Sequence, residues 1–226
     1  MTTPGSGFRA EDVAERLAGF RRRIAAVSRD PAEVTVVAVT KGFGADAVRA
    51  ALGAGLVDIG ENYADELVAK AAETTEAVPA PRWHFLGAVQ RNKVARLAPV
   101  VSCWQGVSRR EEGQAIAKRQ PGAVVLVQVD IAGIPGRGGC PPEEVPDLVA
   151  SLGQEDLEVA GLMAVGPPGP PEEAREGFHR VANLADQLDL RIRSMGMTDD
   201  LEVAVAEGST MVRIGRGLFG DRPARG

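Results

Sequence analysis

The chain has 226 residues, of which 26 are Lys or Arg and 31 are Asp or Glu, so its formal net charge is −5. This acidic balance argues against nucleic acid as the main partner, because binding to a phosphate backbone depends on clustered Lys and Arg. The only cysteines are Cys103 and Cys140, and their spacing is typical of neither a metal site nor a disulfide, so we expect no zinc. The sequence shows no secretory signal and no apolar run long enough to cross a bilayer. We therefore expect a cytoplasmic protein that does not contact a membrane.

The first predicted element is an amphipathic helix at about 10–28. Its apolar side chains recur every three or four residues, which is the spacing of one buried helical face. These side chains are Val13, Leu17, Phe20, Ile24 and Val27.

Apolar, strand-like runs then alternate with stretches of helical length. The eight strand candidates are 34–40, 55–60, 82–87, 100–107, 123–131, 158–166, 190–196 and 210–215. The helix candidates between them are 44–54, 62–76, 90–98, 108–119, 142–152, 171–188 and 199–207. Strands that alternate with helices form a parallel sheet, and eight such units can close into a (β/α)8 TIM barrel. We therefore expect an α/β fold with a single domain over 1–226, in which the extra N-terminal helix precedes a barrel at about 34–220; a doubly wound open sheet is the alternative.

Polar and small residues collect where these strands end. In a barrel the chemistry gathers at the carboxyl ends of the strands. Lys41 directly follows the first strand, "VTVVAVT". A partly desolvated lysine has a lowered pKa and offers a neutral amine for attack on a carbonyl, whereas a solvated lysine would simply begin a surface loop.

Gly215, Gly217 and Gly220 follow the last strand with GxGxxG spacing. Too little chain remains for the helix, strand and acidic residue of a dinucleotide fold, so we do not interpret the spacing as a nucleotide fingerprint. Backbone N–H groups that no side chain covers, next to Thr198, could instead hold one phosphate. A tight turn is the alternative reason for these glycines.

Arg213 lies within the apolar run "TMVRIG". A guanidinium inside the barrel needs an acceptor, because it stays charged and its burial without a partner is costly. The acceptor is either an acidic side chain or a ring nitrogen of a cofactor.

Together these features resemble the pyridoxal 5′-phosphate (PLP) homeostasis protein family, whose fold is similar to the barrel of alanine racemases. The resemblance rests on "VAVTK" at 37–41, "IGENYADEL" at 59–67, "WHFLGAVQRNK" at 83–93, "GLMAVG" at 161–166 and "SMGMTDDLEVAVAEGSTMVRIGRGLFG" at 194–220. The chain departs from the family pattern in "GFG" after the lysine, which affects the shape of that loop, and in "GAVQ" before Arg91.

The resemblance implies the cofactor and the residues that hold it. Lys41 would form an aldimine with PLP, Arg213 would face the pyridine nitrogen, and Thr198 would bind phosphate with the backbone of Gly215 and Arg216. The remaining residues that it places at the site are Asn62, His84, Ser194 and Met195. For His84, a hydrogen bond to the backbone in the core is the alternative to cofactor contact.

An enzyme has to be weighed against a binding protein. A nitrogen that faces arginine stays unprotonated and stabilises a carbanion poorly, which weakens decarboxylation and transamination as functions. Racemases of similar fold also present arginine, but they need a second acid or base, and the only tyrosine here is Tyr63. A lysine-dependent aldolase without a cofactor is a third class.

We therefore expect a non-enzymatic, monomeric PLP-binding protein of vitamin B6 homeostasis, with a PLP-dependent racemase as the alternative. Its partners would be PLP, other B6 vitamers and the apo forms of PLP enzymes that receive the cofactor.

Overall fold

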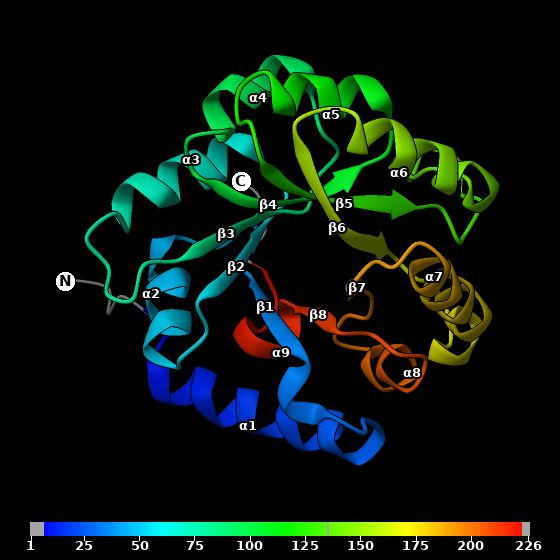
Figure 1. The fold of residues 1–226 in the computed structure, drawn as a ribbon. Coiled ribbons are helices and arrows are strands. Elements are labelled where there is room, and N and C mark those ends of the chain that lie inside the picture. The colour runs from blue at the N-terminus through cyan, green and yellow to red at the C-terminus, as the bar shows by residue number, and fades with distance from the viewer. Residues whose placement is uncertain (1–6, 135, 223–226) are drawn as a thin grey trace.

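A computed structural model describes residues 7–134 and 136–222, and its strands form a closed parallel barrel (Figure 1). The last strand pairs with the first as well as with its predecessor, which confirms the barrel and excludes the open sheet. The strands are β1 Thr35–Val39, β2 Asp58–Glu61, β3 Arg82–Phe85, β4 Val101–Val107, β5 Ala123–Val129, β6 Leu157–Ala164, β7 Ile192–Ser194 and β8 Met211–Ile214.

Helices follow the strands and cover the outside of the barrel (Figure 1). They are α1 Ala10–Val27, α2 Ala45–Gly53, α3 Ala64–Glu73, α4 Arg91–Leu97, α5 Arg110–Ala117, α6 Val145–Gly153, α7 Arg175–Gln187, α8 Leu201–Ala206 and α9 Arg216–Phe219, with 3-10 turns η1 Pro31–Glu33, η2 Pro142–Glu144 and η3 Pro171–Ala174. The proline-led starts of the helices predicted at 142–152 and 171–188 are 3-10 turns, and the short α9 was not predicted.

The additional N-terminal helix packs against α2, α8 and α9. Val13, Phe20 and Ile24 are buried, as the periodicity predicted, and Leu17 is partly buried. The prediction was wrong for Val27, which is 38% exposed because it lies in the last turn of the helix. A Cβ on Gly217 of α9 would lie 2.3 Å from the Phe20 ring. The glycine at this position is therefore required by helix packing.

Apolar side chains fill two regions of the molecule. The large cluster lies between the strands and the surrounding helices, and it includes Trp104, Phe178 and Ile59. A smaller cluster inside the barrel contains Cys103 and Met163. Both cysteines are buried and carry free thiols. In the part of the chain that the structure describes, no helix is both long and apolar enough to cross a membrane.

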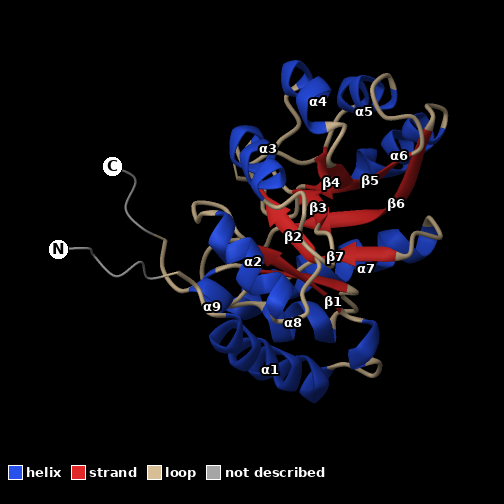
Figure 2. Ribbon diagram, turned by 90° about the vertical axis from the view of Figure 1, so that its left-hand side faces the viewer, coloured by secondary structure: helices blue, strands red, loops and turns tan. Residues whose placement is uncertain are grey.

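All strands of the barrel run the same way, so their carboxyl ends meet on one face. Figure 2 shows the arrowheads of the strands pointing to the end of the molecule where α9 lies. The polar residues that follow β1, β2, β7 and β8 are therefore neighbours in space.

Candidate functional site

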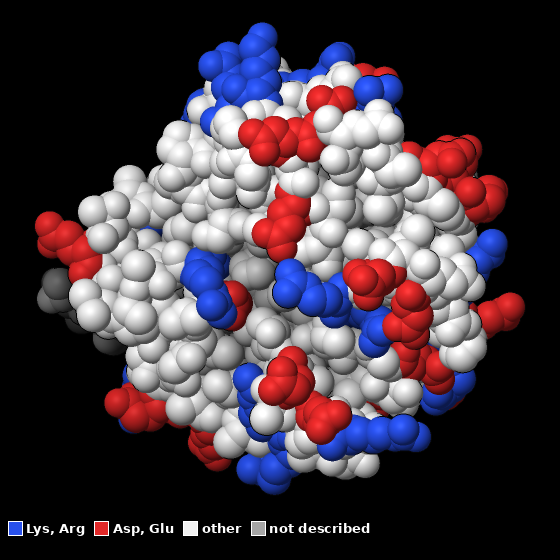
Figure 3. Space-filling view, in the orientation of Figure 1, with Lys and Arg blue, Asp and Glu red and all other residues white. Residues whose placement is uncertain are grey.

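A cavity of about 590 Å³ opens at the carboxyl ends of the strands. Figure 3 shows the opposite end of the barrel, where Lys, Arg, Asp and Glu side chains are scattered among uncharged residues. The structure brings Lys41, Asn62, Thr198, Arg213, Gly215 and Arg216 to the cavity wall, together with Val39, Leu86, Met163, Val165, Met197, Asp199, Gly220, Asp221 and Arg222.

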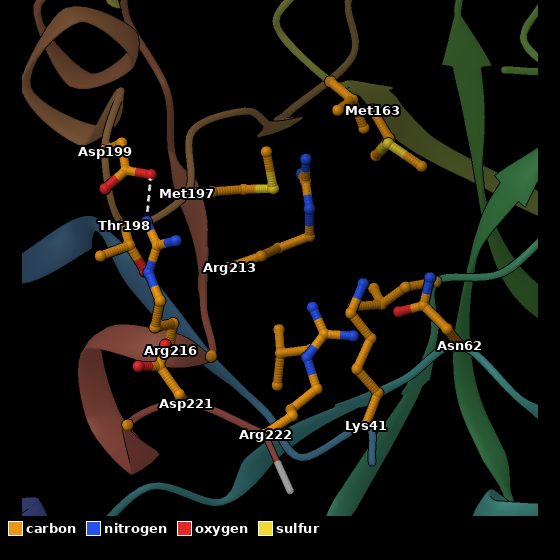
Figure 4. A pocket seen from close by; sticks show the side chains of 15 residues that line it. Lys41, Asn62, Met163, Met197, Thr198, Asp199, Arg213, Arg216, Asp221 and Arg222 are labelled. Atoms are coloured by element: carbon orange, nitrogen blue, oxygen red, sulfur yellow. Dashed lines mark hydrogen bonds and ion pairs between the residues drawn. The ribbon is translucent and has the colours of Figure 1, made fainter. Parts of the chain in front are cut away.

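The cavity has two chemically different sides (Figure 4). Lys41 and Asn62 lie on one side, and Thr198 and Arg216 lie on the other, with Arg213 between them. A ligand with a carbonyl at one end and an anionic group at the other could contact both sides at once.

A tight turn follows β1 and presents Lys41 to the cavity. The Phe43 N–H donates to the Thr40 carbonyl over 3.1 Å, and Gly42 has φ +78°, which favours glycine. Phe43 is buried in an aromatic cluster, edge-on to Phe8 at 5.2 Å between ring centroids. The unusual "GFG" sequence thus has a structural role, because its phenylalanine anchors the turn in the core.

A buried ion pair supports this turn from below. Lys70 Nζ donates to Glu61 Oε1 over 2.6 Å and to the Thr40 carbonyl over 2.8 Å, while the Thr40 hydroxyl donates to the same carboxylate over 2.6 Å. Glu66 accepts from the Gly42 N–H over 2.8 Å and lies 3.3 Å from Lys70 Nζ. The direction of the turn is therefore fixed by charged groups that the cavity does not expose.

The ammonium of Lys41 is half-buried and has no hydrogen bond or ion pair within the described residues. Burial lowers the pKa of Lys41, the positive charges of Arg222 and Arg213 lower it further, and only the more modest effect of Glu61 opposes them. Loss of a proton from such an amine is easier than from a solvated lysine. The site can therefore supply a nucleophilic amine.

Backbone donors lie across the cavity at the start of α9. The Thr198 hydroxyl accepts from the Gly217 N–H over 3.3 Å, which leaves its own O–H free to donate. Within the described residues, the N–H groups of Gly215 and Arg216 donate to no acceptor. The Arg216 side chain pairs with Asp199. Two backbone donors and one hydroxyl thus form a cradle suited to a phosphate.

Arg213 is 5% exposed, and it is held by oxygen atoms other than carboxylates. Its guanidinium donates to the carbonyl and hydroxyl of Ser194 over 2.5 and 2.7 Å and to the Ala164 carbonyl over 2.7 Å. Burial lowers the pKa of Arg213 to about 10, so the side chain stays charged at neutral pH. The acidic partner that the sequence left open is not among these acceptors.

The structure does not bring His84, Ser194 and Met195 to the cavity wall. Met195 is fully buried in the core. Ser194 and His84 belong instead to a chain of hydrogen bonds inside the barrel, in which Ser194 contacts the cavity residue Arg213 directly. His84 of β3 and Ser194 of β7 are 5% and 0% exposed.

This interior chain joins the two ends of the barrel. The Ser194 hydroxyl donates to Gln105 Oε1 over 2.7 Å, Gln105 Nε2 lies 2.7 Å from His84 Nδ1, and His84 Nε2 lies 2.9 Å from Asp58. The guanidinium of Arg213 can only donate, so the Ser194 hydroxyl accepts from it and donates its own proton to Gln105 Oε1. Gln105 Nε2 then donates to His84 Nδ1, which leaves the proton of His84 on Nε2, facing Asp58. His84 therefore helps to orient Arg213 through other side chains, and its partners are side chains, not the backbone.

The sequence of the chain matches known proteins over nearly its full length. Residues 16–223 match the model of the alanine racemase N-terminal domain. The pyridoxal phosphate homeostasis protein of Pseudomonas aeruginosa is 39% identical, over 94% of this chain and 95% of that protein. The protein of the same name from Escherichia coli K12 is 34% identical, over 93% of this chain and 97% of that protein. The chain belongs to the pyridoxal phosphate homeostasis protein family.

The solved structure of PipY from Synechococcus elongatus with PLP bound has a TM-score of 0.80 and 31% identity, and the match covers 92% of this chain and all of that one. Alanine racemase of Clostridium difficile has a TM-score of 0.73 at 14% identity, over 95% of this chain but 58% of that chain. The second likeness shows the fold alone. The predicted family and the racemase-like barrel are both confirmed.

Sequence reasoning missed two groups of site residues in this member of the pyridoxal phosphate homeostasis family. Glu66 and Lys70 form an i, i+4 pair on α3, and that spacing was the available signal for a pair beneath the lysine turn. Asp221 and Arg222 come after the last helix, and no pattern in the sequence shows that this segment lies along the cavity.

Proposed function

We propose that this protein binds PLP through a reversible Schiff base with Lys41 and so serves vitamin B6 homeostasis in the cytoplasm. The observation that carries the proposal is the arrangement of a partly desolvated amine, without a partner in the described chain, across one cavity from a cradle of backbone N–H donors. The family membership and the PLP bound to PipY support the same cofactor.

The polar groups of the cavity fit PLP. Its phosphate would accept from Thr198 and from the backbone N–H groups of Gly215 and Arg216, and Arg213 would donate to the pyridine nitrogen. The Oδ1 atom of Asn62 is buried without a hydrogen-bond partner among the described residues, beside Lys41 in Figure 4, so it has capacity for a ligand. PLP supplies an electrophilic aldehyde that a lysine amine can hold and release.

The same residues support a carrier over an enzyme. A charged Arg213 leaves the pyridine nitrogen unprotonated, which argues against decarboxylation and transamination but not against racemisation, because racemases of similar fold also present arginine. Racemisation needs a second acid or base, and Tyr63 is 41% exposed and lines a separate pocket beside Gln90 and Lys93. We propose that the protein has no robust catalytic activity of its own.

The visible spectrum tests this function most directly. We expect the purified protein to be yellow, and borohydride to fix the mass of PLP on the peptide that contains Lys41. Lys41→Ala should abolish the absorption without unfolding the protein, while the surface control Lys93→Ala should keep it. A wild-type protein that stays colourless and unmodified after addition of PLP would refute the proposal and leave a cofactor-free lysine aldolase as the alternative.

The phosphate cradle needs a separate test. Thr198→Ala should weaken PLP retention, because one of the donors to the phosphate is lost, but it should leave the affinity for pyridoxal, which has no phosphate, nearly unchanged. Equal retention of PLP by this variant and the wild type would remove Thr198 from the cradle.

Turnover and transfer separate the remaining alternatives. Conversion of L-alanine to the D-isomer by the loaded protein at substantial rates would favour the racemase.

We propose that the protein acts as a monomer, takes other B6 vitamers weakly, and passes PLP to the apo forms of PLP enzymes. Sedimentation of the loaded protein and reactivation of an apo-enzyme test these points.

A further inference from the structure

Arg222 is a cation that faces the cavity and that the proposed PLP contacts do not use. It follows α9 and lines the cavity beside Lys41 (Figure 4). Within the described residues its guanidinium has no hydrogen bond or ion pair, whereas Arg216 pairs with Asp199 and Arg213 is held by Ser194. Arg222 therefore keeps all its donors available for a ligand.

The stem of Arg222 is held against the turn that carries Lys41. A Cβ on Gly42 would lie 2.9 Å from Cδ of Arg222, so the lack of a side chain at residue 42 makes room for this stem. The positive charge of Arg222 lowers the pKa of Lys41, in accord with their proximity. The guanidinium is thus positioned next to the amine, although the residue itself is exposed.

The position of this cation separates it from the phosphate cradle. Thr198 and Arg216 lie on the opposite side of the cavity from Lys41 and Arg222, and Asp221 lies on the side of Arg216 (Figure 4). An anion bound by Arg222 would therefore lie near the carbon of PLP that is bonded to Lys41, and not near the phosphate.

Transfer of PLP from Lys41 to another amine requires that amine to attack the same carbon. A carbon–nitrogen double bond to the incoming neutral amine forms, the one to Lys41 Nζ breaks, and the two protons of the incoming nitrogen pass to Lys41, which leaves as a neutral amine, without oxidation or reduction. In an α-amino acid the carboxylate is attached one carbon away from the attacking nitrogen, so both groups reach the site together. Arginine matches a carboxylate with two parallel hydrogen bonds.

We infer that Arg222 binds the carboxylate of α-amino acids, which makes them the amines that most readily release PLP from Lys41. This inference rests on the proposed function, because it concerns exchange at the same lysine. It assigns a substrate class to the site: amines that carry an adjacent carboxylate, in preference to simple amines.

The test compares L-alanine with isopropylamine, which has the same skeleton without the carboxylate. Stopped-flow absorbance of the PLP-loaded full chain measures the exchange rate with each amine. We expect Arg222→Gln to slow exchange with L-alanine about 10- to 100-fold, the usual range for losing a hydrogen bond between charged groups, and to change exchange with isopropylamine less than about 2-fold. Arg222→Gln also alters the pKa of Lys41, but this affects both amines equally and cancels in the ratio of their rates.

Control variants separate the possible outcomes. Arg191→Gln removes an exposed arginine that pairs with Glu158 away from the cavity, and it should leave both rates unchanged. Arg222→Lys should restore part of the preference for L-alanine. Equal slowing of both amines by Arg222→Gln would overturn the inference. It would also be overturned if Arg222→Gln lost affinity for PLP but not for pyridoxal, because Arg222 would then be a phosphate ligand.

The proposed function and the inference fail separately. If borohydride fixes no PLP on the wild-type protein, the proposed function fails and the inference fails with it. If PLP is fixed but Arg222→Gln leaves the ratio of the L-alanine rate to the isopropylamine rate unchanged, only the inference is rejected.

Discussion

Replacing Lys70 by methionine should destabilise the protein strongly, although Lys70 does not line the cavity. The Lys70 and Glu61 side chains are 5% and 0% exposed, and their charged atoms are 2.6 Å apart. The Glu61 Oε2 atom already has no hydrogen-bond partner among the described residues. Without the lysine, the carboxylate would keep only the Thr40 hydroxyl as a donor.

The size of the effect follows from this burial. Removing one partner of a buried ion pair leaves an uncompensated charge and typically costs about 3–5 kcal/mol. We therefore expect Lys70→Met to lower the free energy of unfolding by about this amount. Urea titration followed by tryptophan fluorescence measures the change, because Trp83 and Trp104 are both buried in the folded protein.

Two further variants show whether the buried charge is the cause. Lys93→Met removes a lysine 3.5 Å from Asp65, whose side chain is 70% exposed, and it should cost less than about 1 kcal/mol. Adding Glu61→Gln to Lys70→Met should recover a large part of the loss, because a neutral amide is cheaper to bury than an unpaired carboxylate. A loss below about 1 kcal/mol for Lys70→Met, or no recovery in the double variant, would refute the reasoning.

The deficit of Lys70→Met should also depend on pH. Burial raises the pKa of Glu61 above its ordinary 4.5, and Lys70 opposes this rise, so loss of the lysine raises the pKa further. A carboxyl with a raised pKa in the folded state favours folding below its unfolded pKa, and this contribution is lost as pH rises through the folded pKa. The variant should therefore be closest to wild type near about pH 5 and fall furthest behind near about pH 8.

Three other predictions concern packing, titration and orientation. In urea titrations, Gly217→Ala should lower the free energy of unfolding by about 1–3 kcal/mol, because the new Cβ would overlap the Phe20 ring of α1. The control Gly153→Ala places its Cβ in open space, so it should leave the free energy of unfolding unchanged or raise it by about 0.5–1 kcal/mol. The rate of Schiff-base formation between the apo protein and pyridoxal should rise with pH and level off below 10.5, because the pKa of Lys41 is lowered; a plateau only above that value would contradict a desolvated amine. Gln105→Leu should cost about 1–3 kcal/mol and also shift the visible absorption of the PLP-loaded protein, because Arg213 loses its indirect support; lower stability with an unchanged spectrum would show that Gln105 only packs.

Much of the fold could be read from the order of residues alone. The apolar run before Lys41 and the seven similar runs after it predicted the strands. Their number favoured a barrel over an open sheet, and the pairing of β8 with β1 confirmed it. The runs are local features, because strand and helix periodicity depends on neighbours along the chain. The boundaries were less accurate where proline began a 3-10 turn, as at Pro171, because α and 3-10 turns share the same first residues.

Some of the cavity residues could also be predicted from the sequence, and others could not. Lys41, Thr198 and Arg213 could be anticipated because each lies at or near the carboxyl end of a strand, and the barrel brings those ends together. Whether an inward side chain reaches the rim or remains below it depends on strand register, so His84 could not be placed from its sequence position.

The sequence by itself determined the alternation of strands and helices, the residues at the strand ends and the family, since each of these is written in local patterns. Only the tertiary structure decided that the ion pair of Lys70 lies beneath the lysine turn and that Arg222 returns to the same cavity. Both depend on contacts between segments far apart in the chain, and hydrophobic periodicity carries no information about which charged side chains meet when the barrel closes.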